Sequence, residues 1–316
     1  FLHELLGPVE EARNSSTVWV EDRLVALILG ARIALRDAAD NHWQGTLTTA
    51  LTTAEGYRGK GYSQLAFLHY LDAIIAQGAQ FSFGWLDADR TQAGSSYRLH
   101  SADSALTEGL VLRRVWGKVL DLRQAGWRAG LGRRKRSVVR AVNALFSIGM
   151  RLPQGYDIAD AAEHVDDCID LMDEAESARP LRRLMSAEQL GRWLTFRAEG
   201  MQGVGRVLLA GGRVVGFAYG YTNPISDGAH FLALDGVCFA PGLGYRARRR
   251  FLGHLAAEAR DQYDCCGIIA LQGACNDALI KYGYLPFAST ALGAVSFTPT
   301  LRFSREALAG LRLELR

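Results

Sequence analysis

The chain reads TLTTALTTAEGYRGKGYSQLAFLHYLDAIIAQ from residue 46 to residue 77. The threonine-rich residues 46–53 alternate in character, which is typical of a half-buried strand. Residues 62–77 carry apolar side chains at helical spacing, and a glycine follows them as a common helix terminator. Between the two segments lies a glycine-marked turn that ends in Gly59-Lys60-Gly61. This order of strand, glycine turn and helix predicts an α/β unit.

The same succession of elements is predicted twice along the chain. In the first half, a strand pair precedes the quoted segment and a further strand follows it, at residues 17–21, 24–29 and 80–86. In the second half, two strands flank Gly211-Gly212, which is a strong hairpin signal, at residues 206–210 and 213–219. A strand, a helix and a strand follow at residues 231–239, 251–259 and 266–271. The repetition predicts two copies of one fold.

The length of 316 residues exceeds what one hydrophobic core usually organises and predicts two domains. We expect an N-terminal module at residues 1–125, a basic connector with a short helix at 126–154, and a C-terminal module at 155–316. The chain begins at Phe1 in a helix-like stretch, so we expect the first strand of the N-terminal module to be missing or truncated.

The composition indicates a globular protein from a reducing compartment. The five cysteines form an odd set without ligand-like spacing, which favours a cytoplasmic location. Every apolar run is too short to cross a bilayer, so no membrane partner is expected. The net charge of +3 is too small to indicate nucleic acid by itself, and the basic run at 133–136 lacks interleaved aromatic residues. The sequence also lacks the usual motifs of hydrolases, zinc enzymes and NTPases.

The turn at Arg58-Gly59-Lys60-Gly61 is the strongest chemical signal in the chain. Two positions without side chains let backbone N–H groups approach an anion closely, and the following helix adds the positive end of its dipole. Arg58 and Lys60 add charge-assisted contacts to the same group. A pyrophosphate would fit this turn. The alternative is a plain connection between strand and helix with solvated basic side chains.

These residues resemble the signature of the GNAT superfamily of N-acyltransferases, Arg/Gln-x-x-Gly-x-Gly/Ala. Arg58 and Gly61 match its first two fixed positions, and Ser63 replaces the third by another small residue. The resemblance implies a fold of the α/β (α+β) class, with two modules that are each a mixed, mostly antiparallel twisted sheet flanked by helices. It also implies that an acyl-CoA pyrophosphate is held by Arg58, Gly59, Lys60, Gly61, Tyr62 and Ser63, and the pantetheine arm by Leu51, Thr52 and Thr53.

The resemblance implies an N-acetyltransferase in which a primary amine directly attacks acetyl-CoA or a related acyl-CoA, with no metal. The acceptor is expected to be the amine of a small molecule or a peptide. Whether two copies of the chain form a homodimer stays an open question. Tyr97 aligns with a family tyrosine that often protonates the departing CoA sulfur, although an ordinary packing role fits it equally well. Asp87 and Asp89 are the candidates for the general base, and His100 is a further one.

The C-terminal module resembles the same fold with a degenerate acyl-CoA turn. Counted from Pro241, its three signature positions hold Gly244, Ala247 and Arg249, and an arginine would crowd the phosphates. The arginines at residues 246–250 are otherwise interpreted as a solvated helix start. The family's tyrosine segment is nevertheless kept, with Tyr282 at its centre. We therefore expect this module to be structural or to shape the acceptor site.

Two other classes of function stay open. A tandem fold with one eroded site is also typical of a non-catalytic pseudoenzyme that binds acyl-CoA or a protein partner. Nucleic-acid binding through the basic run at 133–136 is less favoured, and strong salt dependence of retention on a polyanion would distinguish it.

Overall fold

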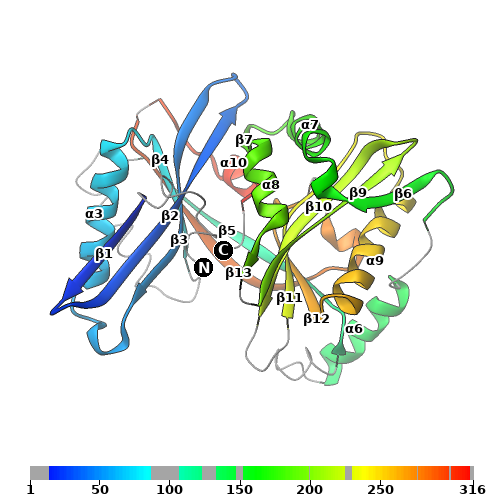
Figure 1. Cartoon of the computed structure of the whole chain (residues 1–316), viewed down its shortest axis with the longest axis horizontal. Coiled ribbons are helices and arrows are strands. Elements are labelled where there is room, and N and C mark those ends of the chain that lie inside the picture. The colour runs from blue at the N-terminus through cyan, green and yellow to red at the C-terminus, as the bar shows by residue number, and fades with distance from the viewer. Residues whose placement is uncertain are drawn as a thin grey trace.

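The computed structural model describes residues 14–86, 107–122, 133–146, 152–198, 200–224, 230–275, 277–298 and 300–313. Through these residues runs one continuous sheet, in the strand order β1-β2-β3-β4-β13-β5-β12-β11-β10-β9-β6. Figure 1 shows the strands of the N-terminal module on the left and those of the C-terminal module on the right, with β5 and β13 between them. No helix in the described part of the chain is long and apolar enough to cross a membrane.

The described residues of the N-terminal module contribute one α-helix of their own, α3, which packs on its strands. Its elements are β1 (Ser15–Val20), β2 (Arg23–Asp37), β3 (His42–Thr53), η1 (Glu55–Tyr57), α3 (Tyr62–Ala76), β4 (Phe81–Leu86) and β5 (Thr107–Val119). The buried side chains of α3 recur every three or four residues, as Ala66, Phe67, Tyr70, Leu71 and Ile74. They pack on Ala26 and Ile28 of β2. This packing fixes the start of α3 next to the end of β3.

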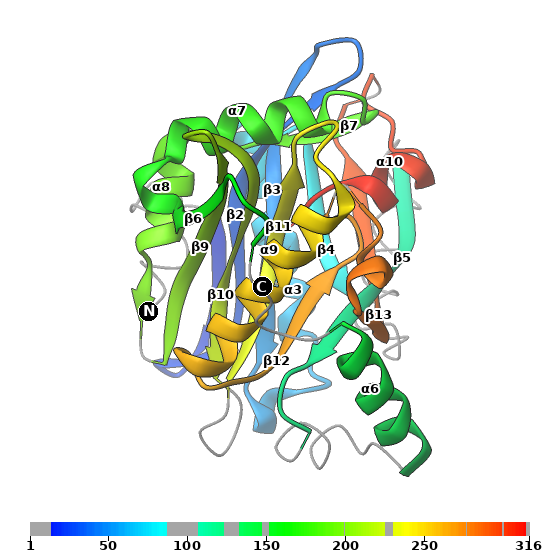
Figure 2. The same ribbon diagram turned by 90° about the vertical axis from the view of Figure 1, so that its right-hand side faces the viewer.

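The C-terminal module has helices on both faces of its strands (Figure 2). Its elements are α6 (Arg133–Leu145), β6 (Tyr156–Asp160), η2 (Ala161–Glu163), α7 (Val165–Glu176), β7 (Leu181–Leu184), α8 (Ala187–Thr195), β8 (Arg197–Ala198), β9 (Met201–Ala210), β10 (Arg213–Pro224), β11 (His230–Phe239), α9 (Tyr245–Asp261), β12 (Cys265–Leu271), η4 (Leu279–Tyr282), β13 (Leu285–Ser296) and α10 (Arg305–Gly310). Successive residues of β11 face opposite sides, with Leu232 packed under α9 and Ala233 under α7 and α8.

The two modules exchange strands. β13 comes from the C-terminal end of the chain, yet it pairs with β4 from Ala291↔Leu86 to Ser296↔Phe81. β5 pairs with β13 on one side and with β12 on the other. Each module is thus completed by a strand of the other, and the sheet crosses both predicted boundaries. The division of the chain into two modules at residues 125 and 155 stays a prediction, which concerns the sequence and not the sheet.

The C-terminal tail completes the core of the N-terminal module. Its buried side chains include Leu301, Phe303, Leu308, Leu311 and Leu313. They pack against apolar residues of β2, β3 and β4, which are Ile33, Leu35, Trp43, Leu47, Phe81 and Phe83. This face of the sheet lies opposite α3, so the N-terminal module depends on residues more than 200 positions away in sequence.

The predicted sheet type is confirmed, because only the pairs β3–β4 and β11–β12 are parallel among the described pairings. Several boundaries were wrong. β2 runs to Asp37 rather than ending at residue 29, and α9 begins at Tyr245 rather than at 251. β5 and β13 were not predicted. β5 contains Arg113 and Lys118, which are buried, and their polar character hides the strand pattern in the sequence.

The burial of Lys118 in β5 can be tested through its pKa. Its side chain is 4% exposed and Nζ donates to the carbonyl of Tyr282 at 3.0 Å. Burial, and secondarily the charge of Arg249, lower the pKa of Lys118 to about 8, below its value of about 10.4 in an unfolded chain. Between these two values the unfolded state binds more protons, so the free energy of unfolding rises with pH.

We expect the stability difference between the native chain and Lys118→Met to rise by about 1–3 kcal/mol from about pH 8 to about pH 10. Urea unfolding at a series of pH values measures this difference. The matched control is Lys60→Met, because Lys60 is exposed and its substitution should leave the pH profile unchanged. A flat difference for Lys118→Met would contradict the buried position.

Candidate functional site

The turn before α3 has the backbone of an anion-binding site. Gly59 and Gly61 have φ of +75° and +83°, a region that side chains disfavour, and a Cβ on either would meet no atom within 4 Å. Gly61 is the N-cap of α3, and no side chain caps the helix there. The first helical bond runs from Leu65 N–H to the Gly61 carbonyl at 3.0 Å. The N–H groups ahead of Leu65 therefore lie next to open space at the positive end of the helix dipole.

The side chains around this turn favour an anion. Arg58 and Lys60 are exposed, and the first turn of α3 contains no acidic residue. The Arg58 Nε lies 3.4 Å from the carbonyl of Thr53, which ties the turn to the end of β3. The Lys60 Nζ lies 5.2 Å from the ring centre of Tyr57, and this ring meets Tyr62 edge-on at 6.0 Å. The two cations are thus held near the glycines without a carboxylate partner in the described residues.

β3 and β4 separate just before this turn. Their parallel pairing runs from Gly45↔Phe81 to Thr48↔Gly84, although both strands continue further. At the point of separation β3 has a bulge at Thr49, where the register against β2 shifts. Beyond it, β3 pairs only with β2 among the described strands, and Leu51 is 46% exposed. In the part of the chain that the structure describes, an unpaired edge of β3 therefore leads to the glycine turn.

The C-terminal module repeats this geometry and corrects the predicted register. β11 and β12 separate after Leu234↔Ala270, next to a bulge at Asp235. The first bond of α9 runs from Arg248 N–H to the carbonyl of Gly244 at 3.2 Å, so Gly244 corresponds to Gly61. Gly242, with φ of +80°, then corresponds to Gly59.

The three signature positions of this module consequently hold Pro241, Gly244 and Arg246. The prediction of Gly244, Ala247 and Arg249 for these positions was wrong by three residues at each of them, because Gly244 is the N-cap of α9 and Ala247 is already a buried residue of that helix. The sequence contained the signal, since both modules have a Gly-x-Gly at the helix start. The residues between bulge and helix differ in number, however, because η1 adds three residues to the N-terminal module.

In the C-terminal module, another segment of the chain pairs with β11 where β11 and β12 separate. Val237, two residues after the bulge like Leu51, donates its N–H to the carbonyl of Ala274 at 2.7 Å. Val237 is fully buried, whereas Leu51 is about half exposed. The segment around Ala274 thus fills the strand edge whose equivalent, β3 beyond Thr48, has no partner other than β2 among the described strands.

The start of α9 is also covered. Arg249 donates to the carbonyl of Leu145 and lies 5.0 Å from the ring centre of Phe146, at the end of α6. Arg248 donates to the carbonyl of Leu243 at 2.7 Å and pairs with Asp277 at 3.3 Å. The interpretation of these arginines as a solvated helix start was wrong for both residues, because their guanidinium groups bind the protein itself.

The predicted catalytic residues Tyr97, Asp87 and Asp89, and the further candidate His100, lie outside the described residues. The corresponding Tyr282 of the C-terminal module is buried and donates to Asp277 Oδ2 at 2.6 Å. Burial, and then Asp277, raise the pKa of Tyr282. Burial alone would raise the pKa of Asp277, but hydrogen bonds from Lys281, Tyr282 and the Ala278 N–H lower it to about 2. Tyr282 therefore anchors the segment around Asp277.

The described residues contain no cluster of three or more potential metal-ligating side chains. All five cysteines are buried, and none belongs to a disulfide bond. Burial, the largest cause in each case, raises the pKa of Cys238 to about 11 and those of Cys265 and Cys275 to about 12. These thiols stay protonated at neutral pH.

No family model matches the chain, and no curated protein matches its sequence. Solved structures do match its fold. N-myristoyltransferase from Saccharomyces cerevisiae with bound myristoyl-CoA gives a TM-score of 0.63 at 10% identity, over 93% of this chain and 74% of that chain. A GCN5-related N-acetyltransferase from Anabaena variabilis gives 0.56 at 12% identity, over 93% and 64% of the two chains. A tandem GNAT protein from the clavulanic acid biosynthesis pathway gives 0.55 at 10% identity, over 90% and 83%.

Proposed function

Because the chain has the tandem GNAT fold, we propose that it is an acyl-CoA-dependent N-acyltransferase whose N-terminal module binds the acyl-CoA. The observation that carries this proposal is the uncapped start of α3 with Gly59 and Gly61, reached along the edge of β3 that no described strand pairs with beyond Thr48. The equivalent edge in the C-terminal module is occupied by the carbonyl of Ala274.

In this proposal the N-terminal turn holds the diphosphate of the co-substrate. The N–H groups of residues 61–63 donate to phosphate oxygens, and Arg58 and Lys60 balance the charge. The pantetheine arm pairs with the backbone of Leu51, Thr52 and Thr53, as an added strand would. The thioester is thereby placed between the separating strands β3 and β4. Binding at both points fixes the thioester before the acceptor arrives.

The proposed reaction moves an acetyl or other short acyl group to a primary amine. The amine nitrogen attacks the thioester carbonyl, so a C–N bond forms and the C–S bond breaks. A base takes the proton from the amine, for which Asp87 and Asp89 are proposed, and Tyr97 is proposed to protonate the departing thiolate. The neighbour with bound myristoyl-CoA uses a longer acyl group, so chain length is part of the test.

The proposal is tested by calorimetry with acetyl-CoA and longer acyl-CoAs, followed by an assay of free CoA thiol with a panel of amines. Binding together with amine-dependent release of CoA supports an acyltransferase. Binding without release from any acyl-CoA and amine pair would indicate the non-catalytic alternative. A failure of every acyl-CoA to bind would overturn both.

Tyr97→Phe is expected to lower kcat about tenfold while leaving acyl-CoA affinity unchanged. The effect is modest because the CoA thiol has a pKa of about 8.5, so its thiolate can leave at neutral pH even without a proton from Tyr97. The matched control is Tyr282→Phe, the equivalent tyrosine of the C-terminal module, which should lower stability and leave kcat intact. Steady-state rates and calorimetry measure both effects. A loss of affinity with unchanged kcat would assign Tyr97 to packing.

A further inference from the structure

The separated strands of the two modules point toward the same part of β5. β4 ends at Leu86, which lies opposite Ala291 of β13 and, through it, opposite Leu112 of β5. β12 ends at Leu271, opposite Val115 of β5. β4 runs parallel to β5 and β12 runs antiparallel to it, so the two carboxyl ends approach each other. Their levels on β5 differ by three residues, roughly 10 Å along the strand.

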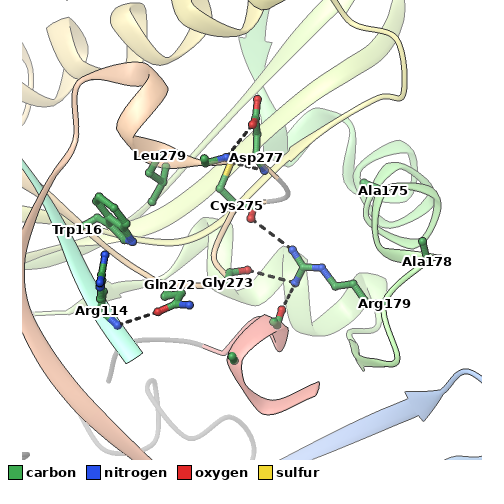
Figure 3. Close-up of a pocket in the computed structure, with 13 residues that line it drawn as sticks. Arg114, Trp116, Ala175, Ala178, Arg179, Gln272, Gly273, Cys275, Asp277 and Leu279 are labelled. Carbon is green, nitrogen blue, oxygen red and sulfur yellow. Dashed lines mark hydrogen bonds between the residues drawn. The ribbon is translucent and has the colours of Figure 1, made fainter. Parts of the chain in front are cut away.

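A cavity of about 750 Å³ lies beside this part of β5 (Figure 3). Arg114 and Trp116 of β5 line one side of it, and Arg179 lines the opposite side. The loop after β12 and the end of α10 contribute the remaining wall, so both modules build the cavity. Its volume falls within the range of about 300–1,000 Å³ that is usual for small-molecule sites.

Two charged groups of the wall are already used by the protein. Arg179 donates to the carbonyls of Gly273, Cys275 and Gly310, and it pairs with Glu176 at 3.5 Å. Asp277 accepts from Tyr282 and Lys281 and pairs with Arg248. These contacts hold the wall together, so neither group needs a ligand.

Arg114 differs from both. Its backbone is fixed, since its N–H donates to the Gln272 side chain at 3.1 Å and its carbonyl accepts the Gln272 N–H at 2.8 Å. Its side chain is exposed, and no group in the described part of the chain pairs with the guanidinium. Trp116 follows on the same face of β5 and provides a half-buried apolar wall beside this cation.

We propose that this cavity binds the acceptor of the acyl transfer, and that Arg114 binds a carboxylate on that acceptor. The acceptor class is a free amino acid whose amine points toward the N-terminal module. A guanidinium matches a carboxylate with two parallel hydrogen bonds, and a rigid strand position favours such pairing. Arg179 and Asp277 are already in ion pairs, whereas Arg114 has no ion-pair partner among the described residues, so the cavity favours an anion beside Arg114. The inference rests on the proposed function.

The test uses the full chain, acetyl-CoA, and a panel of α- and ω-amino acids, each compared with its own carboxamide. The amide keeps the amine and loses the negative charge. The native chain should have a KM about 10- to 100-fold lower for the preferred acid than for its amide, the usual range for a charge-assisted contact. Arg114→Gln should bring this KM ratio close to one. The matched control is Arg213→Gln, an exposed arginine at the start of β10, which should keep the native ratio.

Calorimetry with the preferred amino acid gives a second readout that does not require turnover. Native heat that disappears in Arg114→Gln supports the inference, provided that this variant still binds acetyl-CoA. Equal KM values for acids and amides in an active native chain would overturn the acceptor assignment and leave the proposed function standing. An absence of both amino-acid heat and amino-acid turnover in a chain that binds acetyl-CoA would also overturn it.

Discussion

Gly61→Asp is expected to weaken acyl-CoA binding at least about 100-fold while leaving the fold intact. A carboxylate at this position stands where the diphosphate would lie, and the local space is open, so its charge is not relieved by another contact. The aspartate carboxylate would also accept hydrogen bonds from the backbone N–H groups that the diphosphate needs. The helix tolerates the change at a modest cost, because aspartate, like asparagine, can adopt the left-handed conformation of Gly61, and a negative charge is favourable at a helix start.

Two variants separate charge from backbone effects. Gly61→Asn has nearly the same shape without the charge, and asparagine tolerates the left-handed conformation, so its loss of affinity should be much smaller. Gly244→Asp places the same charge at the equivalent N-cap of α9 and should leave acyl-CoA affinity unchanged. Calorimetry and circular dichroism of all three variants give affinity and fold. The opposite order, with loss only in Gly244→Asp, would transfer the site to the C-terminal module.

Leu308→Ala is expected to lower the free energy of unfolding by about 2–5 kcal/mol. Leu308 is fully buried in α10, within the core that α10 forms with Phe81 and Phe83 of β4. The substitution leaves a cavity between the C-terminal tail and the N-terminal module. Because β5 and β13 are exchanged, the loss should destabilise both modules together.

Urea unfolding followed by tryptophan fluorescence measures this effect, since Trp43 lies in the N-terminal module and Trp193 in the C-terminal one. A single transition at lower urea is expected. Leu145→Ala is the control, because Leu145 is 68% exposed and its truncation should change stability by less than about 0.5 kcal/mol. Two separate transitions, with that of the C-terminal module unchanged, would contradict the interlocked sheet.

Local sequence patterns were sufficient to predict the repeated unit of strand, turn and helix. Two local features carried this prediction, which are the glycines at 59 and 61 and the apolar spacing of α3. Both can be read from residues close together in the sequence. The strand exchange could not be predicted in this way. β13 pairs with β4 across about 200 residues, and nothing within either strand specifies the partner. Register between distant strands depends on the assembled sheet rather than on local propensity.

The candidate site was predictable only in part. The turn at residues 58–61 was located from its residues, while the bulge at Thr49 and the closing contact from Val237 to Ala274 arise from sheet geometry. The cavity beside Arg114 was missed, because its lining residues lie far apart in sequence. An exposed arginine on a strand has no distinctive sequence pattern, so only the fold brings it next to Gln272 and across the cavity from Arg179.

A crystal structure with bound acyl-CoA would decide whether the N-terminal turn holds the diphosphate. We expect diphosphate oxygens within hydrogen-bonding distance of the N–H groups of residues 61–63, and a pantetheine arm alongside Leu51, Thr52 and Thr53. Diphosphate density beside the arginines at residues 246–250, with the N-terminal turn empty, would contradict this expectation.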